Sequence, residues 1–257
     1  MKFQVGDMVT RISYGHDIVF VIDRIEEDTY YLIGKSIRLC ADALEEDLEK
    51  VEKEEDDSEF LERIKPVTLD RNDYFYLPGK ILHIDGDKNY LEKSLKYYKE
   101  ANIWAIGLHE KECDIAGKIN NLLKEYNPNI VVITGHDAYL KKRGNREDIA
   151  NYKNSAFYVN AIKEARKYEK SHEKLIIIAG GCQSSYEDLI KAGANFASSP
   201  KRINIHALDP AIIAVKMSMS NINKDIQIKE ILECTKYGSD GMGGIITKGT
   251  MYVGYPR

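Results

Sequence analysis

Apolar and polar positions alternate along the first 50 residues in four short runs that polar turns separate. Runs of this length, with roughly every second position apolar, are typical of half-buried β-strands. The pattern predicts a small SH3-like β-barrel over residues 1–50. The runs are MVTRIS, IVFVIDRI, YYLIG and IRLCA.

From Lys80 onward the pattern changes to short apolar runs that alternate with amphipathic segments of helical period. Such alternation is typical of parallel strands joined by crossover helices. Residues 79–257 are therefore predicted to form a parallel-sheet α/β domain with a Rossmann-like three-layer arrangement. The predicted strands are KILHID, IWAIGLH, IVVIT and LIIIA, and the predicted helices cover about 89–101, 114–126, 155–169 and 185–192, with a final helix after Asp209.

A strongly acidic stretch lies between these two regions. Eleven acidic and only two basic residues fall between Glu45 and Glu62, a local charge of −9 in a chain of net charge −4. Such a segment buries little apolar surface and is typical of a solvated linker or an exposed helix. We predict an acidic linker over residues 51–78. The remaining chain has no basic stripe interleaved with aromatic residues, so no nucleic-acid partner is expected.

Composition limits the class of protein further. With 257 residues and 43% hydrophobic residues, the chain has sufficient apolar surface for a substantial core. No run approaches the roughly 20 apolar residues of a membrane span, and the start of the chain lacks a secretory signal. We therefore expect a protein that is not secreted and has no membrane partner. The four cysteines form no CxxC pair, so neither disulfides nor a metal site is expected, and no cofactor is required.

Polar residues follow three of the predicted strands. The strands end in HIDGD, TGHDA and GGCQS. In an open parallel sheet the carboxyl ends of the strands meet at one edge, where ligands bind. This edge is expected to carry Asp85, Asp87, His136 and Cys182.

Cys182 and His136 suggest acyl-transfer chemistry. Cys182 follows two glycines and precedes the predicted helix, in which Ser184 and Glu187 have capping-box spacing. A helix N-terminus favours the thiolate, so we expect Cys182 in the turn and not in the core. His136 would take the thiol proton and return it to the leaving amine.

Other residues at this edge are candidates for substrate contacts. The backbone around Gly135, Asp137 and Gly181 is expected to form the oxyanion site. Asp85 and Asp87 either form a carboxylate pocket for a basic side chain, best an arginine, or only shape the DGD turn. His206 is open to either a substrate-orienting or a structural role. The further candidates for lining the cleft are Asn195, Ser198, Ser199 and Asn204.

Five blocks, in this order, closely resemble the YabG sporulation-specific peptidases of spore-forming bacteria: HIDGDKNYLEKSLKYY, VVITGHDA, YKNSAFYVNAIKEARKYE, IIIAGGCQSSYEDLIKAGANFASSP and INIHALDP. The resemblance covers about residues 1–220. It implies a cysteine peptidase with His136 and Cys182 as catalytic residues, which cleaves spore coat or cortex proteins after arginine and can process itself. It also implies a place in the cytoplasm of the sporulating cell and later in the spore.

A more distant likeness is to the caspase, clostripain and gingipain clan, in which the histidine and the cysteine follow successive parallel strands. In that clan glycine usually follows the histidine and alanine precedes the cysteine. Here Asp137 and Gly181 occupy these positions. We expect the second exchange to be mild, whereas Asp137 bears on the oxyanion geometry.

Two alternatives from other classes remain open. IIIAGG followed by DLIKAGANF also resembles a late βα unit of cobalamin-binding or flavodoxin-like modules. Against a small-molecule module, neither a DxHxxG motif nor a GxGxxG after a strand is present. The other alternative is an inactive structural coat protein, against which the intact His136 and Cys182 argue.

Overall fold

The computed structural model describes residues 3–51, 57–65 and 74–255. The chain divides into two compact units between Glu62 and Arg63. The division falls inside the segment 51–78 that the sequence predicts as a linker. Parts of that segment, residues 52–56 and 66–73, lie outside the described residues. Within it the structure has a short helix, α1 (Ser58–Arg63), in which Phe60 is buried despite the surrounding charge.

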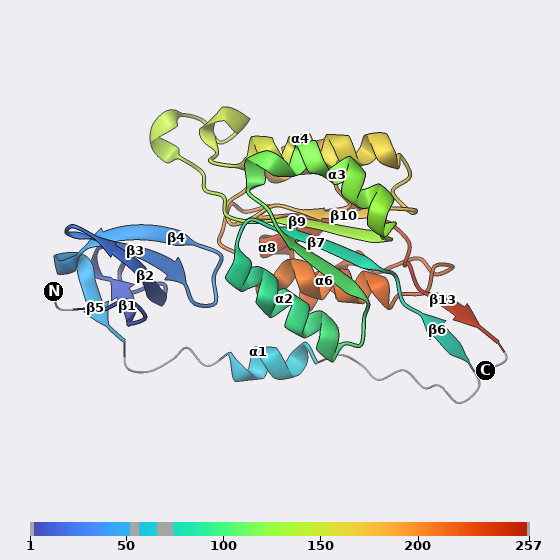
Figure 1. Ribbon diagram of the computed structural model, residues 1–257, viewed down its shortest axis with the longest axis horizontal. Helices are drawn as coiled ribbons and strands as arrows, with labels where there is room; N and C mark the ends of the chain where they lie inside the picture. The colour runs from blue at the N-terminus through green and yellow to red at the C-terminus, as the bar shows by residue number, and fades with distance from the viewer. Residues whose placement is uncertain (1–2, 52–56, 66–73, 256–257) are drawn as a thin grey trace. The chain divides into compact units, whose positions relative to one another are not determined.

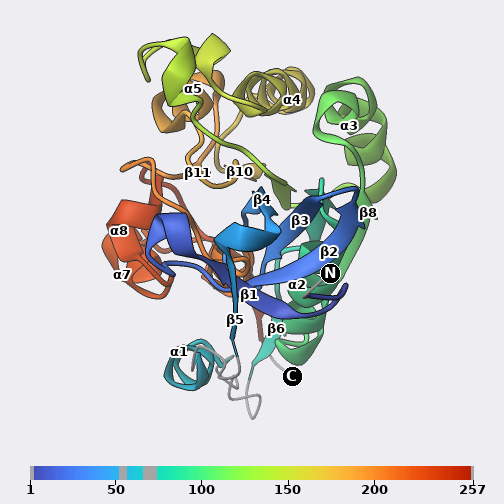
Figure 2. The same cartoon turned by 90° about the vertical axis from the view of Figure 1, so that its left-hand side faces the viewer.

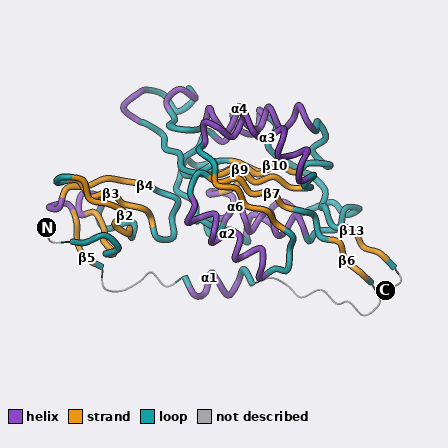
Figure 3. Tube along the Cα trace, viewed as in Figure 1, coloured by secondary structure: helices purple, strands orange, loops and turns teal. Residues whose placement is uncertain are grey.

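The N-terminal unit contains a five-stranded antiparallel sheet of order β4-β3-β2-β1-β5 (Figure 3). Three of the four predicted strands are confirmed, while the fourth is displaced: the pattern predicts IRLCA as a strand, but the strand runs over Cys40–Leu44. The fifth was missed because its residues, LEK, carry too much charge to read as a strand. The five-stranded sheet does not by itself decide the SH3-like class, which stays a prediction. The strands are β1 (Met8–Arg11), β2 (Phe20–Glu26), β3 (Thr29–Gly34), β4 (Cys40–Leu44) and β5 (Leu48–Lys50).

The C-terminal unit is built on a six-stranded sheet of order β12-β11-β10-β9-β7-β8. All neighbouring strands run parallel except β12, which pairs antiparallel with β11. Three of the apolar runs predicted as strands are buried on both faces, as a covered parallel sheet requires, whereas IWAIGLH forms the partly exposed edge strand. The strands are β7 (Ile81–Asp85), β8 (Ala105–His109), β9 (Ile130–Thr134), β10 (Ile176–Ala179), β11 (Phe196–Ser198) and β12 (Met242–Gly244).

Helices cover both faces of this sheet and complete a three-layer α/β/α arrangement (Figures 1 and 2). One face carries α2 (Lys88–Glu100) and α6 (Asp209–Ser218), and the other carries α3 (Glu112–Tyr126), α4 (Ser155–Tyr168) and α5 (Tyr186–Ala192). The α/β class and the five predicted helices are confirmed, but the helix after Asp209 is not the last. Short helices α7 (Ile228–Glu233) and α8 (Gly238–Gly241) follow it, and β6 (Phe75–Leu77) pairs with β13 (Tyr252–Gly254) outside the main sheet.

The strand order brings the three polar strand ends together. β9 lies between β10 and β7, with Ile133 opposite Ala179 and Thr134 opposite Asp85. Because these strands are parallel, the residues that follow them emerge at the same edge of the sheet. The predicted juxtaposition of HIDGD, TGHDA and GGCQS is therefore confirmed.

Candidate active site

His136 lies in the turn that follows β9, with its imidazole held by Asp87. The distance from His136 Nε2 to Asp87 Oδ2 is 2.9 Å, and the ring stands edge-on to Tyr90. Asp87 is also the N-cap of α2, where it accepts a hydrogen bond from the N–H of Tyr90 at 3.0 Å. Burial raises the pKa of Asp87, but the hydrogen bonds from His136 and Tyr90 outweigh it and hold this pKa below its usual value. An ionised carboxylate on Nε2 assigns proton transfer to Nδ1 and stabilises the imidazolium form.

The backbone of His136 is fixed from other elements of the unit. Its N–H donates to Glu112 Oε1 at 2.9 Å, and its carbonyl accepts from Asn154 Nδ2 at 2.7 Å and from the Tyr158 hydroxyl at 3.1 Å. Sequence reasoning missed Glu112, because an acidic residue in the first turn of a helix is common and carries no specific signal.

Cys182 lies in the turn after β10, where Gly180 has a φ of +107° and Gln183 a φ of +56°. The prediction that Cys182 lies outside the core is wrong, since the residue is 0% exposed. Its Sγ accepts a hydrogen bond from the N–H of Ile205 at 3.3 Å. The segment after β11 therefore lies directly against the candidate nucleophile.

The predicted capping box is also wrong. Helix α5 begins at Tyr186, and Ser184 is not its cap. The Ser184 hydroxyl instead accepts the N–H of Gly181 at 2.9 Å and donates to Asp137 at 2.8 Å. Hydrogen bonds inside the turn, and not a helix terminus beside the thiol, thus determine the local conformation of Cys182.

The His136 and Cys182 turns are in backbone contact. A Cβ added to Gly181 would lie 2.4 Å from the carbonyl oxygen of Gly135 and 3.1 Å from the amide nitrogen of Asp137. The clan's alanine would not fit here without a shift of the backbone, so the expectation of a mild exchange is wrong. This contact places side by side the two turns that carry the predicted catalytic residues.

The structure gives the two aspartates of HIDGD different surroundings. Asp85 is fully buried: its Oδ1 accepts the N–H of Asp87 at 2.9 Å and its Oδ2 accepts the Thr134 hydroxyl at 2.8 Å. His83 lies 3.3 Å from the same carboxylate. These contacts favour the turn-forming role for Asp85, while the Asp87 carboxylate is directed to His136.

Three of the predicted cleft residues surround the Cys182 turn. The Ser198 hydroxyl donates to the carbonyl of Gly181 at 2.7 Å, and the Ser199 hydroxyl accepts the N–H of Gln183 at 2.9 Å. Asn204 accepts from the Gln183 side chain at 3.1 Å. These residues support the turn from the side of β11.

The other two candidates have local structural contacts. The Nδ1 atom of His206 accepts the N–H of Leu208 at 3.1 Å, just before α6. Asn195 lies at the opposite edge of the sheet, before β11, where it accepts from Ile177 N–H at 3.0 Å and from Arg166 at 2.6 Å. The structure therefore does not bring Asn195 to the candidate site.

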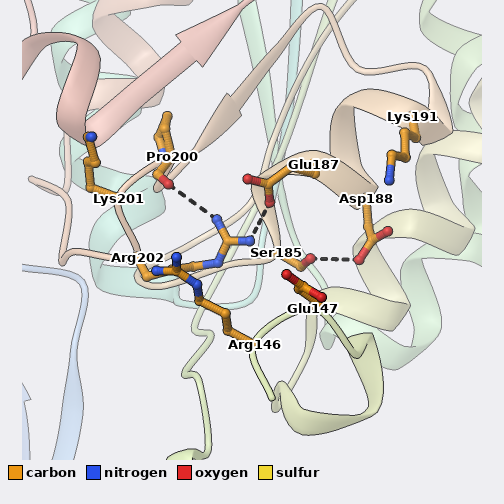
Figure 4. A pocket seen from close by; sticks show the side chains of 9 residues that line it. All are labelled: Arg146, Glu147, Ser185, Glu187, Asp188, Lys191, Pro200, Lys201 and Arg202. Carbon is orange, nitrogen blue, oxygen red and sulfur yellow. Dashed lines mark hydrogen bonds and ion pairs between the residues drawn. The ribbon is translucent and has the colours of Figure 1, made fainter.

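A pocket of about 600 Å³ lies between the start of α5, at Ser185, and the segment around Arg202 (Figure 4). The guanidinium of Arg202 forms an ion pair with Glu187. The Arg202 side chain is only 11% exposed and is therefore largely shielded from solvent. Its Nε donates to the Tyr152 hydroxyl at 2.7 Å. Sequence reasoning did not select Arg202 or Tyr152, since neither belongs to a strand-end motif. The lining residues are Arg146, Glu147, Ser185, Glu187, Asp188, Lys191, Pro200, Lys201 and Arg202.

The described residues contain neither a metal cluster nor a membrane-spanning helix. Across residues 3–51, 57–65 and 74–255, no group of three or more His, Cys, Asp or Glu side chains is arranged to hold a metal ion. In the same described ranges, no helix combines the length and the apolarity needed to cross a membrane.

Comparison with known proteins decides the family. The sequence profile of the family described as "YabG peptidase U57" matches residues 4–256. The chain belongs to the YabG peptidase family. It is 39% identical over 286 aligned residues to the "Sporulation-specific protease YabG" of Bacillus subtilis (strain 168), and the alignment covers 100% of this chain and 99% of the relative. The resemblance seen in the sequence is confirmed, and this YabG-family chain is a protease linked to sporulation.

Solved structures add no functional argument. A family 3 carbohydrate esterase of Clostridium thermocellum is 17% identical with a TM-score of 0.25, covering 39% of this chain and 60% of the esterase. A GDP-L-fucose synthetase of Naegleria fowleri is 18% identical with a TM-score of 0.27, covering 46% of this chain and 33% of the synthetase. Such low TM-scores support no conclusion about the YabG-family chain.

Proposed function

We propose that this chain is a cysteine endopeptidase that cleaves spore coat and cortex proteins on the carboxyl side of arginine during sporulation. The observation that carries the cysteine mechanism is the contact between the His136 and Cys182 turns, through Gly181 and Gly135. Membership of a peptidase family supplies the reaction class. The arginine preference and the spore substrates rest on the family resemblance alone.

The proposed mechanism starts with the Cys182 thiol. His136 takes its proton through Nδ1 while Asp87 holds Nε2, and the thiolate attacks the peptide carbonyl carbon. The imidazolium then protonates the leaving amine, which leaves an acyl-enzyme thioester. Water attacks the thioester with His136 as general base, and the thiol is released with the new carboxyl end.

The backbone contacts narrow the choice of oxyanion donor. The N–H of Gly181 is engaged with Ser184, and that of His136 with Glu112. We propose the N–H of Cys182, the residue that carries the nucleophile, as the principal donor, with the Asp137 N–H on the facing turn as the second. A substrate can reach them only after the segment around Ile205 moves from the sulfur, since Cys182 is buried.

The order of the strands supports the proposed kinship with caspase-like peptidases. The histidine follows β9 and the cysteine follows the adjacent parallel strand β10. Self-cleavage, and a location in the sporulating cell and then the spore, are further parts of the proposal that follow from the resemblance. The proposed SH3-like unit would bind protein substrates or the coat.

The decisive experiment compares the purified protein with Cys182→Ala and His136→Ala variants on unfolded casein, with new peptide termini identified by mass spectrometry. We expect the wild type to produce termini after arginine, and both variants to produce none. A Cys40→Ala variant is the matched control, because Cys40 is exposed on β4 of the N-terminal unit, whereas Cys113 directly follows Glu112, the partner of the His136 N–H. Cleavage by Cys182→Ala at the wild-type rate would refute the cysteine mechanism, and termini after other residues would refute the arginine preference.

A further inference from the structure

Asp137 connects the two turns of the proposed catalytic dyad. Its carboxylate is 2% exposed and accepts four hydrogen bonds. Oδ1 accepts the N–H groups of Ala138 at 2.9 Å and Asn154 at 2.8 Å. Oδ2 accepts the hydroxyls of Ser155 at 2.5 Å and Ser184 at 2.8 Å. One side chain thus joins the His136 turn, the start of α4 and the Cys182 turn.

The hydroxyls of Ser155 and Ser184 also bind the backbone of the Cys182 turn. Ser184 accepts the N–H of Gly181 at 2.9 Å, and Ser155 accepts the N–H of Ser185 at 2.8 Å. Gly181 directly precedes Cys182. The chain of hydrogen bonds therefore runs from the residue after His136 to the residue before the cysteine.

The chemistry of the carboxylate determines the direction of every hydrogen bond in this chain. An ionised carboxylate only accepts, so both hydroxyls must donate to it. Their lone pairs are then directed to the two backbone N–H groups. Burial raises the pKa of Asp137 above its usual value, and the hydrogen bonds from Ser155, Asn154, Ser184 and Ala138, which favour the charged form, offset this rise only in part.

We propose that Asp137 is a positioning residue of the peptidase, which holds the Cys182 turn against the His136 turn through the hydroxyls of Ser155 and Ser184. This inference rests on the proposed Cys–His mechanism. It gives a function to the aspartate that replaces the usual glycine after the histidine. The Asp137 side chain does not touch the reacting atoms; it acts through the backbone on both sides of Cys182.

The variant Asp137→Asn tests the direction of the hydrogen bonds at nearly unchanged shape. The amide oxygen can still accept from Ala138 and Asn154, but the amide nitrogen then faces the hydroxyls of Ser155 and Ser184 as a donor. Each hydroxyl must then accept from the amide nitrogen as well as from its backbone N–H, and its own proton loses the carboxylate that accepted it, so the geometry of both contacts changes. Because small misplacement of a reacting group is costly, we expect kcat to fall by about 10- to 100-fold with little change in KM.

The kinetics use a fluorogenic peptide built on the preferred casein cleavage, together with thermal unfolding to verify folding. Ser184→Ala breaks the same chain of hydrogen bonds at its middle. The kcat of the double variant Asp137→Asn/Ser184→Ala should therefore be no lower than that of whichever single variant is less active. Asp188→Asn is the control, since the hydrogen bond of Asp188 with Ser185, at 2.6 Å, is of the same kind but does not reach the His136 turn. We expect its kcat within about twofold of the wild type.

The outcomes separate this inference from the proposed function. A wild-type kcat in a folded Asp137→Asn variant would overturn the positioning role and leave the Cys–His mechanism unaffected. The same holds if the fold-losses of kcat in the two single variants multiply in the double variant. If Asp137→Asn does not fold, the single variants Ser155→Ala and Ser184→Ala decide, and the inference fails if both keep wild-type kcat. Activity of Cys182→Ala would instead overturn the mechanism on which the inference rests.

Discussion

The backbone N–H of Ile205 donates a hydrogen bond to the Sγ of Cys182 at 3.3 Å, and the sulfur is sealed from solvent. The turn before Ile205 carries two non-glycine residues with positive φ, Ser199 at +62° and Arg202 at +57°. Such conformations are unfavourable for residues with a Cβ and persist only where surrounding contacts hold them. In this turn, the ion pair of Arg202 with Glu187 is one of those contacts.

Cys182 should therefore react slowly with small thiol reagents. We expect iodoacetamide to alkylate it at least about tenfold more slowly than the exposed Cys40, as mass spectrometry of the digested protein would measure. Glu187→Gln removes the charge that holds Arg202 and should accelerate alkylation of Cys182 but not of Cys40. Lys191→Gln, which removes one charge from the same pocket, is the control. Equal rates for Cys182 and Cys40 in the native protein would contradict the buried position.

Replacing Asp87 should impair catalysis without removing a helix start. Asparagine is as good an N-cap as aspartate, so Asp87→Asn preserves the beginning of α2. It removes the negative charge from His136 Nε2 and permits the wrong tautomer of the ring. By analogy with the aspartate of a Ser-His-Asp triad, we expect kcat to fall by about 10²- to 10⁴-fold. Steady-state kinetics on the fluorogenic peptide would measure the effect, and an unchanged kcat would exclude Asp87 as the partner of the catalytic histidine.

Gly181→Ala should destabilise the C-terminal unit. The new methyl group would overlap the carbonyl oxygen of Gly135, and this oxygen belongs to backbone that cannot rotate away. Overpacking of this kind costs about 1–3 kcal/mol in the free energy of unfolding. Gly117→Ala is the control: no atom lies within 4 Å of its added Cβ, and alanine is favoured inside α3 by about 1 kcal/mol. Urea unfolding should move the two variants in opposite directions, and similar midpoints would show that the turns are not in close contact.

The periodic pattern of the sequence was sufficient for most of the C-terminal sheet and its helices. It could not reveal β11 and β12, because three-residue strands such as FAS and MGG carry no measurable period. β12 reaches its place only by pairing antiparallel with a strand more than 40 residues earlier in the chain. Periodicity reports local burial, whereas these strands exist through long-range contacts.

In the candidate site too, the residues with a local sequence signal could be predicted, whereas the long-range contacts could not. His136 and Cys182 could be selected from the sequence because each follows a recognisable apolar strand. The partner of His136 is 49 residues away, and the residue on the Cys182 sulfur is 23 residues away, so neither contact has a local signature. Asn195 was misjudged for the opposite reason: it is close in sequence to the cleft residues but precedes its strand instead of following it.

Asn195→Ala should reduce stability and leave the chemistry intact. The side chain of Asn195 accepts from Ile177 N–H and from Arg166, and donates to the carbonyl of His172 at 2.8 Å. Burial lowers the pKa of Arg166 to about 10, which reflects the cost of placing this cation inside the unit. Loss of the amide leaves buried donors without acceptors and should lower the free energy of unfolding by about 1–3 kcal/mol. Thermal unfolding and kcat at a permissive temperature would test this, and a loss of kcat in the folded variant would place Asn195 in the catalytic machinery after all.

The Asp87–His136 hydrogen bond also fixes the sign of a pH effect on stability. Burial raises the pKa of Asp87, but the hydrogen bonds from His136 and Tyr90 lower it to a net value below the ordinary value of about 4. The unfolded chain therefore binds this proton more readily than the folded chain. The contribution of Asp87 to stability is complete above about pH 4 and is lost as the pH falls through the depressed folded pKa.

Urea unfolding of the wild type and Asp87→Asn between pH 2.5 and 6 would measure this contribution. The wild type should be the more stable protein at pH 6, and the difference should narrow below about pH 4 as the carboxylate takes up its proton. The asparagine variant has no proton to bind at this position, so its own stability serves as the reference at each pH. A difference that stays constant down to pH 2.5 would mean that the charge of Asp87 contributes nothing, and one that widens would mean that its folded pKa is raised and the carboxylate is not stabilised by His136.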